Sequence, residues 1–224
     1  METTPFQTTQ TEVEVSEKFF EKFSYECIVG SVIAPSLYKN CIEIHSDLEI
    51  VNGEPTTPIH DDLNWHYTRF GKSTSPNLEA AFFMQEDGDV WQAKLSKPLI
   101  DAKGKTRKYE TPKSAGSRAY FPSINQETKK AISKRYSCEV PPCGESFWTW
   151  LKKHPEINII LTEGGKKALC LLSQGYVAIA LVGVDGGYMS NQNGVRLPAP
   201  QLIPDLAGFA IAGRHFVLTF DQDP

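Results

Sequence analysis

Three short apolar segments near the end of this 224-residue chain constrain its fold more than any other feature. They are residues 157–162, 177–181 and 215–220, and each is shorter than a typical helix. Each is also too continuously apolar for a strand with one face in water. We therefore expect the three segments to form strands of a parallel sheet that is buried on both faces.

The connection between the first two segments predicts a helix. The first segment ends at Glu163, Gly164 and Gly165, and residues 166–174 consist mainly of types that favour helices. Gly175 follows, at the position where a glycine commonly ends a helix. The order of strand, glycine turn, helix and strand is typical of α/β proteins with parallel sheets.

Carboxylates end two of the expected strands. Glu163 follows the first, and Asp221 and Asp223 follow the third. Parallel strands end at a shared edge, and alternation along the strand makes the two aspartates point the same way. Oxygen ligands of this kind suit Mg²⁺ or Mn²⁺, which also bind substrate phosphates. Either motif alone is more often a turn or a solvated loop, but their combination and order favour a metal site, with Asp185 as an optional fourth carboxylate.

The start of the expected helix favours an anion. Backbone N–H groups and the helix dipole attract phosphate at this position, so we expect Gly164 and Gly165 to contribute to phosphate binding. Lys166 and Lys167 would extend that site. The alternative is that these lysines form a solvated helix face.

Two sequence blocks carry a resemblance to a known family. Residues 162–168 read Thr-Glu-Gly-Gly-Lys-Lys-Ala, and residues 220–223 read Phe-Asp-Gln-Asp. With the order of strands, these blocks resemble the Toprim domain shared by bacterial primases, topoisomerases and some nucleases. They are more similar to a poorly characterised Toprim-like family, which occurs near the start of long replication proteins of bacterial plasmids and mobile elements. The resemblance covers about the last third of the chain.

The resemblance implies a function in DNA replication. It implies metal-dependent nucleotidyl transfer of the primase type, with Glu163 as acid/base or metal-proximal carboxylate and Asp221 and Asp223 as Mg²⁺ ligands. Lys166 and Lys167 would then steady phosphates. The implied partners are single-stranded or primed nucleic acid, nucleotides and a downstream helicase-type region of a longer chain.

Two alternatives to primase chemistry remain open. The wider Toprim pattern often has an acidic residue four positions after the glutamate, where this chain has Lys167. Strand cleavage of the nuclease or topoisomerase type is one alternative, although no tyrosine can be singled out as its nucleophile. A non-catalytic nucleic-acid-binding module is the other. The chain has no GxxxxGK[ST] motif, so a nucleotide-hydrolysing P-loop is excluded.

The preceding part of the chain predicts a smaller α+β domain. Residues 80–84 and 90–95 are expected to form a β-hairpin, because an Asp-Gly turn separates them. Short helices are expected from Ser16, within residues 31–41, and at residues 147–153. We therefore predict a disordered tail at 1–15, an accessory domain at 16–145 and a Toprim-like domain at 146–224.

A basic segment interrupts an otherwise acidic chain. Residues 94–135 contain twelve Lys and Arg against three Asp and Glu, whereas the whole chain has a formal net charge of -4. Basic side chains interleaved with aromatic ones favour binding of phosphates and stacking of bases. We expect Lys103, Lys105, Arg107 and Lys108 to bind nucleic acid, and Tyr109, Tyr120 and Phe121 are the interleaved aromatic residues. A solvated lysine-rich loop is the alternative.

Composition argues against several other classes. Five cysteines with no CxxC spacing do not indicate a disulfide framework or a zinc ribbon, so a reducing cytoplasm is expected. No apolar run approaches 18 residues and no signal-peptide pattern is present, so a membrane location is not expected.

The position of the last carboxylates predicts that the chain is a fragment. It stops one residue after Asp223, whereas a doubly wound sheet normally continues beyond such a strand. The sequence therefore predicts an α/β, Toprim-like parallel sheet with flanking helices that is C-terminally incomplete. We expect residues 1–224 by themselves to bind metal and nucleic acid weakly and to be inactive in nucleotide incorporation.

Overall fold

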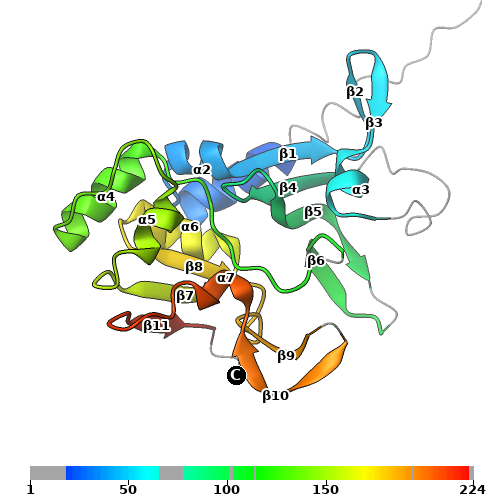
Figure 1. The fold of residues 1–224 in the computed structure, drawn as a ribbon. Helices are drawn as coiled ribbons and strands as arrows, with labels where there is room; N and C mark the ends of the chain where they lie inside the picture. The colour runs from blue at the N-terminus through cyan, green and yellow to red at the C-terminus, as the bar shows by residue number, and fades with distance from the viewer. Residues whose placement is uncertain (1–18, 66–77, 101–102, 114, 193, 222–224) are drawn as a thin grey trace, which may run out of the picture.

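The computed structural model describes residues 19–65, 78–100, 103–113, 115–192 and 194–221, and these form a mixed α/β fold (Figure 1). The predicted tail at 1–15 and Asp223 lie outside the described residues. The described strands form a three-stranded parallel sheet, a four-stranded antiparallel sheet and two small two-stranded sheets.

The parallel sheet contains the three predicted strands. They are β7 (Ile159–Glu163), β8 (Ala178–Leu181) and β11 (Phe216–Thr219), in the spatial order β11-β7-β8. Helix α6 (Gly165–Ser173) connects β7 to β8, as the glycine turn and the helix-forming residues predict. The prediction of a parallel sheet is therefore confirmed, including its strand direction.

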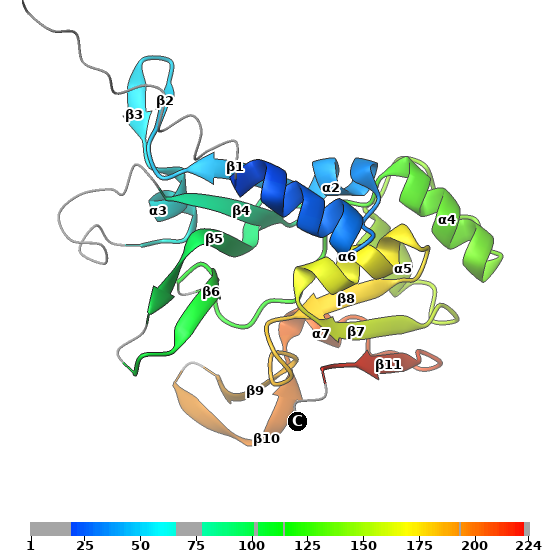
Figure 2. The ribbon, with the colours of Figure 1, turned by 180° about the vertical axis from the view of Figure 1, so that it is seen from behind.

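Helices cover both faces of the parallel sheet. Helix α6 lies on one face, and α5 (Phe147–Lys152) and α7 (Pro204–Ala207) lie on the other (Figures 1 and 2). Every residue of β8 is buried, whereas β11 exposes Val217 and Leu218 at 44% and 63%. The expectation that all three strands are buried on both faces is therefore wrong for β11, which is an exposed edge strand of this sheet.

The antiparallel sheet has the order β1-β4-β5-β6. Its strands are β1 (Ile42–Ser46), β4 (Glu79–Met84), β5 (Val90–Ile100) and β6 (Thr106–Glu110). The predicted hairpin is confirmed as β4 and β5, and Gly88 in its turn has φ +92°, which glycine adopts without a Cβ clash.

The remaining elements surround these sheets. Residues 19–25 are helical and continue into a π-helical turn, η1 (Glu26–Gly30). The others are α2 (Pro35–Cys41), β2 (Glu49–Val51), β3 (Glu54–Thr56), α3 (Pro58–Asp62) and α4 (Gln126–Tyr136). The helices predicted near residue 16, within 31–41 and at 147–153 thus correspond to the 19–25 helix, α2 and α5.

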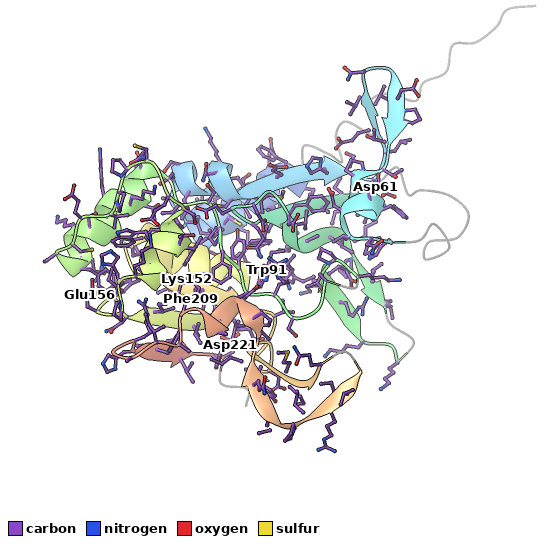
Figure 3. The ribbon with its side chains drawn as sticks, in the orientation of Figure 1. Asp61, Trp91, Lys152, Glu156, Phe209 and Asp221 are labelled. Atoms are coloured by element: carbon purple, nitrogen blue, oxygen red, sulfur yellow. The ribbon has the colours of Figure 1, made fainter. Side chains whose placement is uncertain are left out.

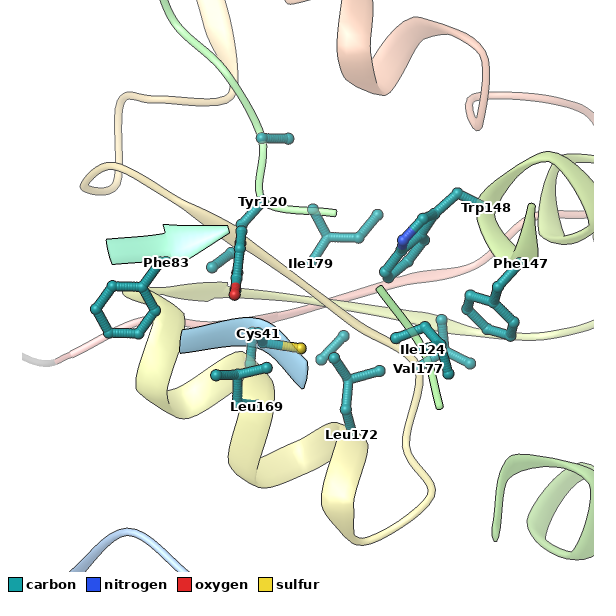
Figure 4. Packing of buried hydrophobic residues seen from close by; sticks show 14 of the residues in the cluster. Cys41, Phe83, Tyr120, Ile124, Phe147, Trp148, Leu169, Leu172, Val177 and Ile179 are labelled. Carbon is teal, nitrogen blue, oxygen red and sulfur yellow. The ribbon is translucent and has the colours of Figure 1, made fainter. Parts of the chain in front are cut away.

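One buried cluster connects the two large sheets. It includes Phe83 from β4, Leu169 from α6 and Ile179 from β8, with Tyr120 between them (Figure 4). The backbone N–H of Tyr120 donates to the carbonyl oxygen of Ala180 at 2.9 Å, so this segment lies against β8. The predicted division at residue 145 stays a prediction, and buried side chains on its two sides belong to this one cluster.

The segment after β8 differs from the sequence-based expectation. The Asn- and Gly-rich sequence of residues 185–194 predicts a flexible loop at the edge of the parallel sheet. Instead, β9 (Tyr188–Gln192) and β10 (Val195–Leu202) pair there as an antiparallel hairpin. The sequence between these strands is Asn193-Gly194, a dipeptide that favours two-residue hairpin turns. This turn signal, rather than the polarity of the segment, indicated its structure.

Candidate functional site

Local backbone geometry places Glu163 at the carboxyl edge of the parallel sheet. It is the last residue of β7, and Gly164 follows with φ +82°, a conformation that favours glycine. The backbone N–H of Gly164 donates to the carbonyl oxygen of Leu181 at 3.2 Å. This bond holds the turn against the end of β8, so α6 begins directly above the strand ends.

A cavity of about 470 Å³ brings most of the predicted site residues together. The predicted residues among those that line it are Glu163, Gly164, Gly165, Lys166, Lys167 and Asp221. Gln92, Tyr109 and the segment Leu181 to Gly183 complete its walls. We call this space the sheet-edge cavity. Topology explains the grouping, because β11 pairs with β7 in parallel register and Asp221 follows β11.

Lys167 forms an ion pair with Asp221. Their side chains are 44% and 64% exposed, so the pair contributes little to the stability of the fold. It does define the chemistry of this side of the cavity, because the lysine neutralises the carboxylate that was predicted to bind a metal. A metal at Asp221 or a phosphate at Lys167 would therefore compete with this ion pair.

Lys166 points to a different carboxylate. One carboxylate oxygen of Glu26, in η1, accepts a hydrogen bond from Lys166, and the other accepts one from Lys94 in β5 at 2.5 Å. Partial burial acts to raise the pKa of Glu26, but the hydrogen bonds from Lys166 and Lys94 lower it below its ordinary value. Burial likewise acts to lower the pKa of Lys166, and Glu26 and Tyr109 reverse the shift and raise it.

Sequence reasoning missed Glu26 altogether, and it assigned Tyr109 to the basic segment rather than to this cavity. Glu26 is 140 positions from Lys166, and no motif connects the two. Tyr109 lines the sheet-edge cavity, and burial raises the pKa of its hydroxyl. The π-helical turn that carries Glu26 is a rare structure that occurs frequently at functional sites, but this turn leaves no clear sequence signal.

Two carboxylates of the sheet-edge cavity have different surroundings. Asp221 is ion-paired, whereas no described side chain or backbone N–H forms a hydrogen bond or ion pair with the Glu163 carboxylate. The described residues contain no group of three His, Cys, Asp or Glu that could hold a metal. Mg²⁺ is usually bound by one or two carboxylates together with substrate phosphates, so the donor set of Glu163 and Asp221 is chemically compatible with it.

None of the four basic residues predicted to bind nucleic acid lines the sheet-edge cavity. Lys103, Lys105 and Lys108 are exposed near or within β6, and Arg107 forms an ion pair with Glu110 at 2.7 Å. The structure thus brings together the residues predicted at the sheet edge but does not bring this basic group to them.

Much of the remaining basic segment has structural partners. Arg118 pairs with Asp205 through Nε at 2.9 Å, and Arg135 donates to the carbonyl oxygen of Gln174. The expectation that aromatic residues of this segment stack bases is wrong for Tyr120, which is fully buried. Part of the basic segment therefore has structural contacts within the fold, which charge counting could not reveal.

Asp185, the optional fourth carboxylate, does not line the sheet-edge cavity. Its carboxylate accepts a hydrogen bond from the hydroxyl of Tyr188 at 3.0 Å. Figure 3 shows Asp221 near the parallel sheet and Asp61 in the distant part of the molecule that contains α3. Asp61 is one of the acidic residues around another cavity, which does not include Glu163 or Asp221.

Comparisons with known proteins connect the parallel sheet to a family whose function is unknown. Residues 147–224 match the family described as Domain of unknown function (DUF3854). Over 119 residues, or 52% of this chain, the sequence is 40% identical to an uncharacterized protein of Picosynechococcus sp. (strain ATCC 27264 / PCC 7002 / PR-6). The matched part covers 12% of that relative, and no solved structure matches the chain.

The family match covers the charged residues that line the sheet-edge cavity. It includes Glu163, Lys166, Lys167 and Asp221, whereas Glu26 and the antiparallel sheet lie outside it. Among the described residues, no helix has the length and apolar character needed to cross a membrane.

Proposed function

We propose that this chain contains the Toprim-like domain of a DNA replication protein and takes part in metal-dependent nucleotidyl transfer of the primase type. The observation that carries the proposal is the sheet-edge cavity, which is lined by Glu163, Asp221, Lys166 and Lys167 at the start of α6. Carboxylates and an anion-binding helix start at the carboxyl ends of parallel strands suit a substrate that carries phosphates and a divalent metal.

The carboxylates have separate roles in this proposal. Glu163 has no described hydrogen-bond or ion-pair partner, so it is available to accept a proton from an attacking hydroxyl or to act as a ligand. Asp221, with Asp223, would hold Mg²⁺ or Mn²⁺ once Lys167 releases it. The metal, when bound, supplies charge neutralisation at the transferring phosphate.

The two glycines contribute in different ways. A Cβ on Gly164 would meet no heavy atom within 4 Å, so this side of the turn is open toward a ligand. A Cβ on Gly165 would lie 2.5 Å from Phe83, so Gly165 instead permits α6 to pack on the antiparallel sheet. Lys166 and Lys167 extend the positive surface at the helix start and would steady phosphates.

A second candidate function is a non-catalytic nucleic-acid-binding module. The observation that favours it is the ion pair between Lys167 and Asp221, which neutralises a carboxylate that catalysis would need. In this function the sheet-edge cavity binds a phosphate through its lysines and backbone N–H groups, and no bond is made or broken.

Strand cleavage through a covalent tyrosine intermediate has one candidate residue, Tyr109, which lines the sheet-edge cavity. Burial raises the pKa of its hydroxyl, which makes the nucleophilic phenolate less available. This argues against Tyr109 as the nucleophile of a strand-cleavage reaction. The variant Tyr109→Phe should therefore leave any cleavage of a labelled DNA strand unchanged.

The test combines nucleotide binding with nucleotide incorporation. Purified protein is mixed with a labelled nucleoside triphosphate, first with Mg²⁺ and then with EDTA, and template-dependent incorporation is measured in parallel. We expect metal-dependent binding that Glu163→Gln weakens at least tenfold and that the control Asp185→Asn leaves unchanged.

The same experiment distinguishes nucleotidyl transfer from a non-catalytic binding module. Incorporation that disappears in Glu163→Gln supports nucleotidyl transfer, whereas binding that is unaffected by EDTA and by Glu163→Gln supports the non-catalytic module. That residues 1–224 alone are inactive stays a prediction, and incorporation by this chain would contradict it while supporting the proposed function.

A further inference from the structure

A second cavity, of about 390 Å³, lies beside the N-terminal helix and the β5–β6 part of the antiparallel sheet. Among the side chains that line it are four lysines, Lys22, Lys94, Lys97 and Lys108, and two phenylalanines, Phe19 and Phe23. We call it the lysine cavity. It lies outside residues 147–224, which match the family, and it shares no lining residue with the sheet-edge cavity.

The charges of the lysine cavity favour a polyanion. Two glutamates, Glu26 and Glu79, also line it, so the lysines exceed the carboxylates there. Glu79 is buried at 4% exposure, and Glu26 binds Lys166 as well as Lys94. The side chains of Lys22, Lys97 and Lys108 are exposed, which leaves positive charge at the mouth of the cavity.

Aromatic rings accompany these lysines. Phe19 is partly buried and stacks on Phe23, with ring centroids 6.0 Å apart and an interplanar angle of 12°. Lys94 Nζ lies 5.0 Å from the centre of the Phe23 ring. Cationic side chains beside a stackable ring are the combination that single-strand binding surfaces use, because every base has a face that can stack.

Glu26 connects the lysine cavity to the sheet-edge cavity. Its carboxylate accepts hydrogen bonds from Lys94, which lines the lysine cavity, and from Lys166, which lines the sheet-edge cavity. Lys94 Nζ also lies 5.9 Å from the ring centre of Tyr109, another residue of the sheet-edge cavity. A chain of charged and aromatic groups thus runs from one cavity to the other.

We infer that the lysine cavity binds the phosphate backbone of a single-stranded nucleic acid and directs the strand toward the sheet-edge cavity. The inference rests on the proposed function for the direction of the strand, but the binding itself requires neither metal nor catalysis. Lys22, Lys97 and Lys108 contact phosphates, and Phe19 stacks a base.

The experiment measures the salt dependence of binding without metal. Fluorescence anisotropy of a labelled single-stranded oligothymidylate is recorded over a range of salt concentrations in EDTA. Each phosphate contact contributes about -0.7 to the slope of log K against log salt, so Lys22→Gln/Lys97→Gln/Lys108→Gln should flatten the slope by about 2. Phe19→Ala should weaken binding about fivefold or more without a change of slope.

Control variants distinguish binding at the lysine cavity from nonspecific attraction of the nucleic acid to the protein's positive charge. Lys39→Gln/Lys130→Gln/Lys134→Gln removes the same charge from three exposed lysines that line neither cavity, and its slope should equal that of the parent. Thermal unfolding of each variant establishes that it is folded. If the triple variant of the lysine cavity does not fold, the single variants Lys97→Gln and Lys108→Gln replace it. Each should flatten the slope of log K against log salt by about 0.7.

Three outcomes would overturn the inference. They are an unchanged slope in the lysine-cavity variants, equal flattening in the control triple, and displacement of the oligonucleotide by an acidic peptide at equal charge concentration. If metal-dependent nucleotide binding is absent while the EDTA measurement gives the expected slopes, the proposed function is wrong, but single-strand binding by the lysine cavity is supported.

Discussion

The parallel and antiparallel sheets contribute different chemistry to the same cavity. The parallel sheet supplies the carboxylates Glu163 and Asp221 and the start of α6 through the order of its strands. The antiparallel sheet supplies Gln92 and Tyr109 to the cavity wall and Lys94 to the ion pairs of Glu26. The strand order of the parallel sheet brings Glu163, Asp221 and the start of α6 together, whereas the positions of the antiparallel-sheet residues depend on how the two sheets pack.

That packing is concentrated where Phe83 meets the start of α6. The Phe83 ring contacts the aromatic rings of Phe23, Trp91, Tyr109 and Tyr120, with centroid distances from 6.0 to 6.5 Å. It also fills the space into which a Cβ on Gly165 would point. The first two predictions therefore test whether the sheets depend on each other at this point.

Phe83→Ala should have the largest effect. Removing a fully buried phenylalanine should lower the free energy of unfolding by about 3–5 kcal/mol. Because the two sheets share one buried cluster, urea unfolding followed by tryptophan fluorescence and by far-UV circular dichroism should give coincident transitions. Phe20→Ala, at a side chain 49% exposed, is the control, with a change within about 0.5 kcal/mol. Separate transitions in Phe83→Ala would show that the parallel sheet folds independently.

Gly165→Ala should be the next most destabilising change. The added methyl group would lie 2.5 Å from Phe83, so we expect a loss of about 1–3 kcal/mol in the free energy of unfolding. Adding Phe83→Leu should recover part of that loss, and a double-mutant cycle in urea measures the coupling. Strict additivity of the two changes would contradict the packing described here.

These two positions also show what the sequence could and could not predict. The apolar segments, the glycine turn and Gly175 indicate β7, α6 and β8 because their signals are local. The grouping of Glu163 with Asp221 follows from parallel strand order. The contact of Gly165 with Phe83 could not be predicted in this way, because it joins elements from different sheets.

The basic segment, residues 94–135, also has contacts that could not be predicted from local sequence. The excess of Lys and Arg in residues 94–135 was visible, but Arg107 and Arg118 have ion-pair partners that charge counting cannot identify. Tyr120 was interpreted as a base-stacking residue because its neighbours are basic, yet it is fully buried beside β8. Burial of a single aromatic residue depends on tertiary packing, so composition is a poor guide to it.

Glu26→Gln should change how stability depends on pH. Lys166 and Lys94 lower the pKa of Glu26, so the folded state favours the ionised carboxylate more than the unfolded state does. That contribution is present above the unfolded pKa of about 4.3 and is lost as pH falls through the lower folded value. Between pH 5 and pH 3 the parent should therefore lose more stability than Glu26→Gln, as measured by urea unfolding. Parallel pH profiles would show that these ion pairs are unimportant in solution.

The smallest expected effect concerns the four basic residues first predicted to bind nucleic acid. Of Lys103, Lys105, Arg107 and Lys108, the last is the member that lines the lysine cavity. Replacing all four by Gln should therefore flatten the salt dependence of single-strand binding by about 0.7, the value for one phosphate contact. Anisotropy titrations provide the measurement. A change near 2.8, the value for four contacts, would show that the β5–β6 hairpin binds the strand along its whole length.

The most direct test of the central claim is a calorimetric titration with Mn²⁺. The sheet-edge cavity should bind the metal weakly through Glu163, Asp221 and Asp223, and binding heat should be lost in Asp221→Asn/Asp223→Asn. The control Asp185→Asn, which changes a nearby carboxylate outside the cavity, should titrate like the parent. Identical isotherms for the parent and the double variant would contradict the claim that this edge of the parallel sheet is a metal site.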